Sequence, residues 1–157
     1  PYSIFFCIEG LSVDGHRYVD DAIFQGAKVI VHSKDIEKQP GIIYIKVADA
    51  LDELNRVSNV FYDYPSKKMR VVGVTGTSGK TVVASMVKSV MDHYCKAAYM
   101  GTISLEYDGV EEQCPYTTPE TLYVQKKLFD MARRGVKQVV MVWHLKELMQ
   151  SILILLF

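Results

Sequence analysis

A strand that leads into a glycine-rich loop and then into a helix is the feature that most constrains this chain. Residues 69–74 (MRVVGV) have the apolar, β-branched composition of a strand, and helical spacing of apolar residues resumes at Lys80. The six residues of the loop are Gly76, Thr77, Ser78, Gly79, Lys80 and Thr81. Glycines allow backbone N–H groups to converge on phosphate oxygens, and the start of a helix adds partial positive charge. The segment therefore predicts a site for the phosphates of ATP.

Two side chains of this loop have distinct expected roles. Lys80 is expected against the β- and γ-phosphates, and the hydroxyl of Thr81 is expected to bind Mg²⁺. The general motif G-x-x-x-x-G-K-[ST] would place glycine at position 74, where this chain has Val74. The loop is therefore a variant of that motif in the same strand–loop–helix setting.

The composition indicates a globular protein and argues against two classes of partner. The 157 residues suffice for one ordinary domain or two small ones. Lys and Arg number 18 and balance 18 Asp and Glu, so no basic field attracts nucleic acid. The apolar stretch at residues 151–157 is shorter than the roughly 20 residues of a membrane span, and no signal peptide is recognised. Three cysteines without a C-x-x-C pair favour reduced thiols in a cytoplasmic protein.

The chain alternates strand and helix signals, which predicts an α/β fold with a mainly parallel sheet. A break that contains Pro65 lies at residues 62–68 and separates two predicted domains, 1–66 and 67–157. Asp49 is expected to cap the helix before this break, and Asp108-Gly109 to form a hairpin turn. The predicted strands are 3–8, 28–32, 42–47, 69–74, 96–100, 103–107, 110–113 and 136–142, and the predicted helices are 19–26, 50–61, 80–94 and 119–135.

Three ordered motifs resemble those of the Mur ligase family, which makes the peptide of bacterial peptidoglycan. They are TGTSGKT at 75–81, GLSVDGH at 10–16 and TTPE at 117–120. The paired threonine is similar to that of the member that adds the third amino acid to UDP-N-acetylmuramoyl-L-alanyl-D-glutamate (MurE type). The resemblance covers about residues 4–141. It implies a small N-terminal UDP-substrate-binding α/β domain, followed by the first part of a P-loop parallel-sheet ATPase domain.

The resemblance also implies two groups of substrate-binding residues. Leu11, Ser12 and Val13 would line the uridine nucleotide site, while Thr117 and Thr118 would hydrogen-bond the UDP-sugar peptide near its reacting carboxylate. From the residues alone, Ser12 could belong to a surface turn and Thr118 could be a helix cap. The implied activity is ATP-dependent amide ligation through an acyl phosphate. Its partners would be UDP-N-acetylmuramoyl-dipeptide and an amino acid, lysine or diaminopimelate, with ATP and Mg²⁺ as cofactors.

The resemblance ends inside the last predicted strand. The family places a Glu after the position of Met141 to hold Mg²⁺, whereas this chain continues Val142-Trp143-His144. We interpret residues 142–157 as the result of a reading-frame change or premature truncation, and we expect no turnover from this chain alone. Two alternatives stay open. One is a non-catalytic remnant that binds nucleotide or phosphate, and the other is a small P-loop kinase.

Overall fold

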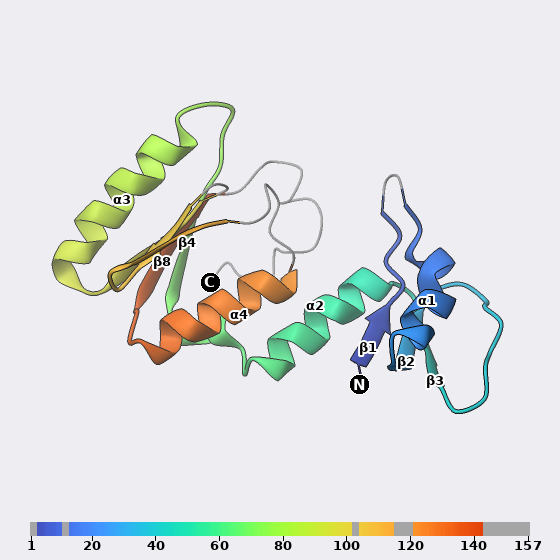
Figure 1. The fold of residues 1–157 in the computed structure, drawn as a ribbon. Coiled ribbons are helices and arrows are strands. Elements are labelled where there is room, and N and C mark those ends of the chain that lie inside the picture. Colours follow the sequence, from blue (N-terminus) through green and yellow to red (C-terminus); the bar gives the residue numbers. More distant parts are fainter. Residues whose placement is uncertain (1–2, 11–12, 102–103, 115–120, 143–157) are drawn as a thin grey trace. The chain divides into compact units, whose positions relative to one another are not determined.

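The computed structural model describes residues 3–10, 13–101, 104–114 and 121–142 (Figure 1). The chain divides into two compact units, Pro1–Val57 and Ser58–Phe157. Both units combine helices with β-sheets, so the predicted α/β class is confirmed. Within the described ranges, no helix is long and apolar enough to cross a membrane.

The first unit is built on a three-stranded parallel sheet in the order β1-β2-β3. Parallel neighbours need a crossover connection, and α1 supplies the one between β1 and β2. The elements are β1 (Ser3–Phe6), a 3-10 turn (Gly15–Tyr18), α1 (Val19–Phe24), β2 (Ala27–His32), β3 (Ile43–Lys46) and the start of α2 (Ala50–Phe61). Cys7, Val19, Ala27 and Ile30 form the buried centre of this unit.

The cap of α2 is the one expected from the sequence. Asp49 Oδ1 accepts hydrogen bonds from the N–H groups of Leu51 at 2.7 Å and Asp52 at 3.1 Å. These are two of the N–H groups that a helix leaves unpaired at its start. The Asp49 cap therefore pairs two N–H groups in the first turn of α2, which begins at Ala50.

The second unit contains a five-stranded sheet in the order β4-β8-β5-β6-β7. The first three strands of that order are parallel, and the last two form an antiparallel hairpin. Asp108 and Gly109 turn this hairpin with φ of 48° and 77°, as the Asp-Gly signal predicted. The elements are β4 (Arg70–Val74), α3 (Lys80–Tyr94), β5 (Ala97–Met100), β6 (Ser104–Tyr107), β7 (Val110–Gln113), α4 (Thr121–Arg133) and β8 (Gln138–Val142).

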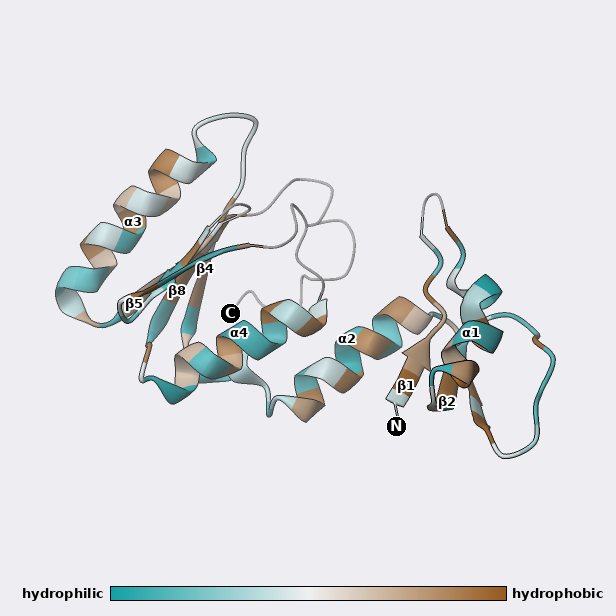
Figure 2. Cartoon of the chain, in the orientation of Figure 1, coloured by the Kyte–Doolittle hydropathy of each residue, from teal (hydrophilic) through white to brown (hydrophobic). Residues whose placement is uncertain are grey.

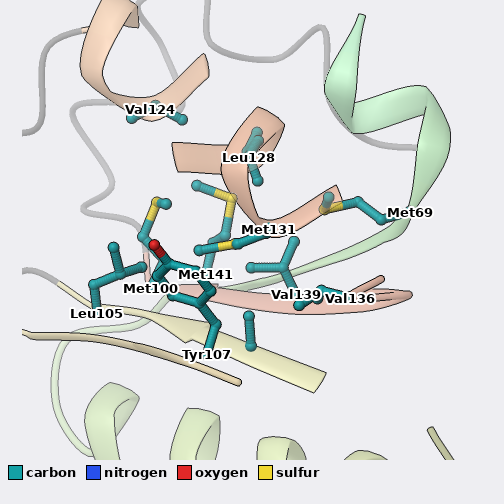
Figure 3. Close-up of a cluster of buried hydrophobic side chains, with 11 residues drawn as sticks. Met69, Met100, Leu105, Tyr107, Val124, Leu128, Met131, Val136, Val139 and Met141 are labelled. Carbon is teal, nitrogen blue, oxygen red and sulfur yellow. The ribbon is translucent and has the colours of Figure 1, made fainter. Parts of the chain in front are cut away.

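Helices cover both faces of this sheet (Figure 1), which explains why β8 is apolar from Val139 to Val142. Successive residues of a strand point to opposite faces. Val139 and Met141 therefore pack beneath α4, in the cluster of Figure 3, while Val140 and Val142 pack beneath α3. The members of the cluster beneath α4 are Met69, Ala98, Met100, Leu105, Tyr107, Val124, Leu128, Met131, Val136, Val139 and Met141.

The helix α3 is only partly buried by the sheet. Apolar and polar residues alternate along it (Figure 2), and Ala84 is its one buried residue, with Val87 and Met91 packed beside it. Several apolar side chains stay exposed, namely Val82, Val83, Met86, Val90 and Tyr94.

The three parallel strands end at one edge of the sheet, and this edge positions the site. Val74 pairs with Val142, and Met100 pairs with Met141, so β4, β8 and β5 finish level with one another. In open α/β sheets, ligands bind outside the carboxyl ends of the strands. The glycine-rich loop follows β4 at this edge, and Gly101 follows β5.

Candidate phosphate-binding site

The loop between β4 and α3 depends on two glycines. Gly76 has a φ of 154° and Gly79 a φ of 73°, values that residues with a Cβ rarely adopt. Gly79 is also the N-cap of α3, and its carbonyl accepts the first helical hydrogen bond, from the N–H of Val83 at 3.0 Å. The predicted strand–loop–helix arrangement is therefore present, with α3 beginning at Lys80.

The start of α3 has the properties of an anion site. In the described part of the chain, no side chain forms a capping hydrogen bond to this helix end. The first N–H groups of a helix have no partner inside it, and the helix dipole adds partial positive charge there. Residues 75–79 and 81–83 are exposed and Lys80 is half-buried, so the loop and the first turn of α3 are open to solvent. Phosphate oxygens can accept hydrogen bonds from them.

The Lys80 side chain bends back over the loop. Its Nζ donates to the carbonyl oxygen of Gly76 at 2.8 Å, so the ammonium group lies on the loop itself. A phosphate held by the loop would meet this cation directly. The position agrees with the role expected for Lys80, which stays a prediction.

Tyr99 of β5 places a hydroxyl in the layer between α3 and the sheet. The residue is buried, at 6% exposure, among Ala84, Val140 and Val142. Burial raises the pKa of Tyr99, so the phenol is protonated at neutral pH. Thr81, the residue expected to bind the cation, is exposed at the start of α3.

Gly101 makes room for the Tyr99 ring. A Cβ on Gly101 would lie 2.3 Å from the Tyr99 Oη and 2.7 Å from its Cζ. Residues 99 and 101 are two apart, so they face the same side of the sheet. The ring therefore lies along the strand toward the carboxyl edge, above Gly101.

The loop fits the phosphates of a magnesium nucleotide. The uncapped helix end, the two positive-φ glycines and Lys80 suit the anion, and the exposed Thr81 hydroxyl suits a hard cation that prefers oxygen. The end of β8, beside β4, offers no second cation ligand at the position after Met141. That position is Val142, whose apolar side chain is buried beneath α3.

Most of the predicted substrate-binding residues also lie outside the described residues. These are Leu11, Ser12, Thr117 and Thr118, and their roles stay predictions. Val13 is described and is 51% exposed. Its carbonyl accepts a hydrogen bond from the Gly10 N–H at 2.9 Å, and Glu9 pairs with Asp14 as an antiparallel bridge.

The polar side chains that follow Val13 form a hydrogen-bonded cluster, which sequence analysis missed. Asp14 accepts from His16 Nδ1 at 2.6 Å and from Lys34 Nζ at 2.6 Å. His16 Nε2 accepts from the backbone N–H groups of Ser33 at 3.2 Å and Lys34 at 3.3 Å. Lys34, and to a lesser degree His16, hold the pKa of the Asp14 carboxyl well below its usual range. The residues are 17 to 20 positions apart in most of these pairs, so no local motif reveals them.

Family comparisons match both halves of the chain. The model described as "Mur ligase family, catalytic domain" matches residues 1–66, and the one described as "Mur ligase middle domain" matches residues 74–150. The second match extends past Val142, where sequence analysis ended the resemblance.

Several curated relatives share one name. They include the UDP-N-acetylmuramoyl-L-alanyl-D-glutamate--2,6-diaminopimelate ligases of Alkaliphilus metalliredigens and Oceanobacillus iheyensis. The first is 37% identical over 142 residues, which cover 90% of this chain and 29% of that protein. The second is 41% identical over 142 residues, which cover 88% of this chain and 28% of that protein. The chain thus spans less than a third of the length of these relatives.

Solved structures show the same fold. One is a UDP-N-acetylmuramoyl-L-alanyl-D-glutamate--2,6-diaminopimelate ligase, with a TM-score of 0.73 and 20% identity, over 95% of this chain and 30% of that one. Another is the MurF ligase of Thermotoga maritima in complex with ADP, with a TM-score of 0.57 and 18% identity, over 91% of this chain and 29% of that one. The predicted resemblance is confirmed, and the chain belongs to the Mur ligase family.

Proposed function

We propose that this chain carries the UDP-substrate domain and the first part of the ATP-binding domain of a ligase of peptidoglycan precursor synthesis. The ligase adds the third amino acid to UDP-N-acetylmuramoyl-L-alanyl-D-glutamate. The observation that carries the proposal is the uncapped glycine loop at the start of α3, at the carboxyl edge of the sheet. Curated relatives at 37% and 41% identity bear the name of this activity. The proposed domains are residues 1–66 and 67–157.

The loop residues would serve the first chemical step. In the proposed reaction the terminal carboxylate of the substrate takes the γ-phosphoryl group of ATP, and ADP leaves. The amine of the incoming amino acid then attacks the acyl phosphate, and inorganic phosphate leaves. Negative charge spreads over the transferring group, so the Lys80 ammonium and the first amides of α3 would stabilise the transition state. Thr81 would hold Mg²⁺, which supplies further positive charge when bound.

We propose two groups of substrate contacts. Leu11, Ser12 and Val13 would contact the uridine nucleotide, and Thr117 and Thr118 the peptide near the carboxylate. The relatives are named for 2,6-diaminopimelate, so this amino acid is the first to test, with lysine as the alternative. We place the reaction in the cytoplasm, in keeping with the free thiols of the three cysteines.

A second candidate is a non-catalytic module that binds the same ligands. Val142 follows Met141, where the family has a Glu, and that observation favours binding without turnover by this chain. The kinase alternative explains neither match to the Mur ligase models.

Two assays on the purified 157-residue chain test these proposals. Calorimetric titration with UDP-N-acetylmuramoyl-L-alanyl-D-glutamate measures substrate binding, and Val13→Asp is expected to weaken it because Val13 is exposed on the predicted uridine segment. Val60→Asp, an equally exposed valine in α2, is the matched control. ADP release with ATP, Mg²⁺ and diaminopimelate or lysine measures turnover, and we expect none. Ligation by the chain alone would contradict the non-catalytic candidate, and absence of UDP-substrate binding would contradict the proposed domain.

A further inference from the structure

Two short arms of backbone lie opposite each other after β1. One arm is Glu9 and Gly10, and the other is Val13 and Asp14. Glu9 pairs with Asp14 as an antiparallel bridge, and the Gly10 N–H donates to the Val13 carbonyl at 2.9 Å. Val13 belongs to the segment expected to contact the uridine nucleotide. The contacts that keep the two arms together therefore also determine where Val13 lies.

Lys34 contacts both arms from a different part of the chain. It follows β2, the parallel neighbour of β1, so it reaches the same edge of the sheet as the arms. Its Nζ lies 3.0 Å from Glu9 Oε2 and donates to Asp14 Oδ2 at 2.6 Å. The other oxygen of Glu9 accepts from Ser33 Oγ at 2.9 Å, and that of Asp14 accepts from His16 Nδ1 at 2.6 Å. One ammonium group thus joins the carboxylates of the two arms.

Two histidine rings hold the backbone from which Lys34 extends. His16 Nε2 accepts from the Lys34 N–H at 3.3 Å, and the His16 side chain is only 7% exposed. His32 Nδ1 donates to the Lys34 carbonyl at 2.7 Å, and His32 is buried at 3% exposure. Both polar groups of the Lys34 peptide backbone are therefore paired with rings that the first unit keeps in place. The Lys34 ammonium has a fixed base, unlike that of a lysine on a free surface loop.

The charges on the two arms require such a cation. Lys34 holds the pKa of the Glu9 and Asp14 carboxyl groups below their usual values, so both are ionised at neutral pH. Like charges directly opposite each other on paired antiparallel segments destabilise the pairing. Without Lys34, the two carboxylates would repel each other across the bridge that they form.

We propose that Lys34 is a positioning residue, which holds Val13 in place for the uridine nucleotide by joining the two arms. This inference rests on the proposed function of the first domain. When only a fraction of the molecules has the arms together, the apparent affinity for the ligand falls by that fraction. Lys34→Met keeps an unbranched side chain and removes the charge, and with two exposed ion pairs lost we expect binding about 3–10-fold weaker.

Calorimetric titration of the full 157-residue chain with UDP-N-acetylmuramoyl-L-alanyl-D-glutamate tests the proposal. Lys46→Met is the matched control, because Lys46 is similarly exposed and pairs with one carboxylate, that of Asp35, at 2.6 Å. In the Lys34→Met background, Glu9→Gln is expected to recover part of the affinity, because it removes one of the two like charges. In the wild-type background, Glu9→Gln is expected not to strengthen binding, because it removes a partner of Lys34.

Two measurements without ligand accompany the titration. Exchange of the Gly10 amide, followed by NMR, reports the hydrogen bond between the arms. It is expected to be faster in Lys34→Met than in the wild type and unchanged in Lys46→Met. Thermal unfolding by circular dichroism checks that each variant is folded.

The outcomes separate this inference from the proposed function. If the wild-type chain does not bind the UDP-substrate, the proposed domain function is wrong, and Gly10 exchange still shows whether Lys34 joins the arms. If the wild type binds and Lys34→Met matches Lys46→Met in affinity, Lys34 has no positioning role. An absence of recovery by Glu9→Gln in the Lys34→Met background contradicts the inference as well. Equal strengthening by Glu9→Gln in both backgrounds would show that Lys34 acts on the ligand through its charge and not through the arms.

Discussion

Replacing Gly101 by alanine introduces one methyl group where the Tyr99 ring lies. The new Cβ would be 2.3 Å from Oη, 2.7 Å from Cζ and 2.8 Å from Cε1 of Tyr99, whereas ordinary contacts start at 3.4 Å. The backbone of Gly101 needs no positive φ, so the cost is one of packing. The ring must move, and Ala84 and Val140, both fully buried, lie against it.

The magnitude follows from this packing loss. Overfilling a packed interior by a methyl group costs about 1–3 kcal/mol. We therefore expect Gly101→Ala to lower the free energy of unfolding of the second unit by about 1–3 kcal/mol. Tyr99→Leu removes the three clashing atoms, so it should recover much of the loss in the double variant.

Gly109→Ala is the matched control for this substitution. Gly109 has a φ of 77° and no atom within 4 Å of a built Cβ, so alanine there strains only the backbone, by about 1–2 kcal/mol. Hydrogen exchange of the β5 and β8 amides, measured during urea unfolding, reports the free energy of unfolding of the second unit separately. A Gly101→Ala effect below about 0.5 kcal/mol, within the range of a neutral surface change, would refute the packing argument. The packing argument would also be refuted if Tyr99→Leu recovered as much stability in the Gly109→Ala variant as in the Gly101→Ala variant.

Three further predictions concern other parts of the fold. Asp49→Ala removes the cap of α2 and should lower the free energy of unfolding by about 1 kcal/mol in urea, whereas Asp52→Ala, which caps nothing, is the comparison. Leu128→Ala empties a fully buried position beneath α4 and should cost about 2–5 kcal/mol in the same assay, and a smaller cost would mean that the cluster is loosely packed. The lowered pKa of Asp14 means that its carboxylate stabilises the first unit above about pH 4 and that this contribution is lost as the pH falls further. The stability difference between wild type and Asp14→Asn, measured by urea midpoints, should therefore shrink below pH 4, and a difference that grows there would contradict the assignment.

Local signals in the sequence predicted the elements of the fold closely. The helix 80–94 and the hairpin turn at Asp108-Gly109 have the predicted bounds, because a glycine loop and an Asp-Gly pair specify their own backbone conformations. Every predicted strand and helix is present, and the ends that the structure describes are displaced by at most two residues. The predicted starts at residues 103 and 119 lie outside the described residues. The unit boundary lies inside α2, at Val57/Ser58, whereas the sequence break is at 62–68. The apolar spacing of α2 continues unbroken across Val57/Ser58, so the sequence pattern gave no sign of a boundary before residue 62.

The contacts that shape the candidate site were beyond reach of sequence patterns. The carboxyl edge beside the loop depends on strand order, because β8 is the last described strand in the chain yet lies between β4 and β5. The Asp14–Lys34 contact joins residues 20 apart and depends on the chain that follows β2. In the sequence, Gly101 only marks the end of a strand. Its steric role, leaving room for the Tyr99 ring, becomes evident from the structure.

Binding of ATP to the 157-residue chain in the presence of Mg²⁺ tests the central claim most directly. Lys80→Ala removes the loop cation, and Lys88→Ala removes the same charge from the same helix, beside Asp92 and away from the loop. A charge-assisted hydrogen bond contributes about 1.5–3 kcal/mol, so Lys80→Ala should weaken ATP binding by roughly 10-fold or more. Lys88→Ala should leave the affinity within about 2-fold, since Lys88 pairs with Asp92 and lies about two helical turns from Lys80. Equal affinities of the two variants, or no binding of ATP by the wild-type chain, would contradict a phosphate site at the start of α3.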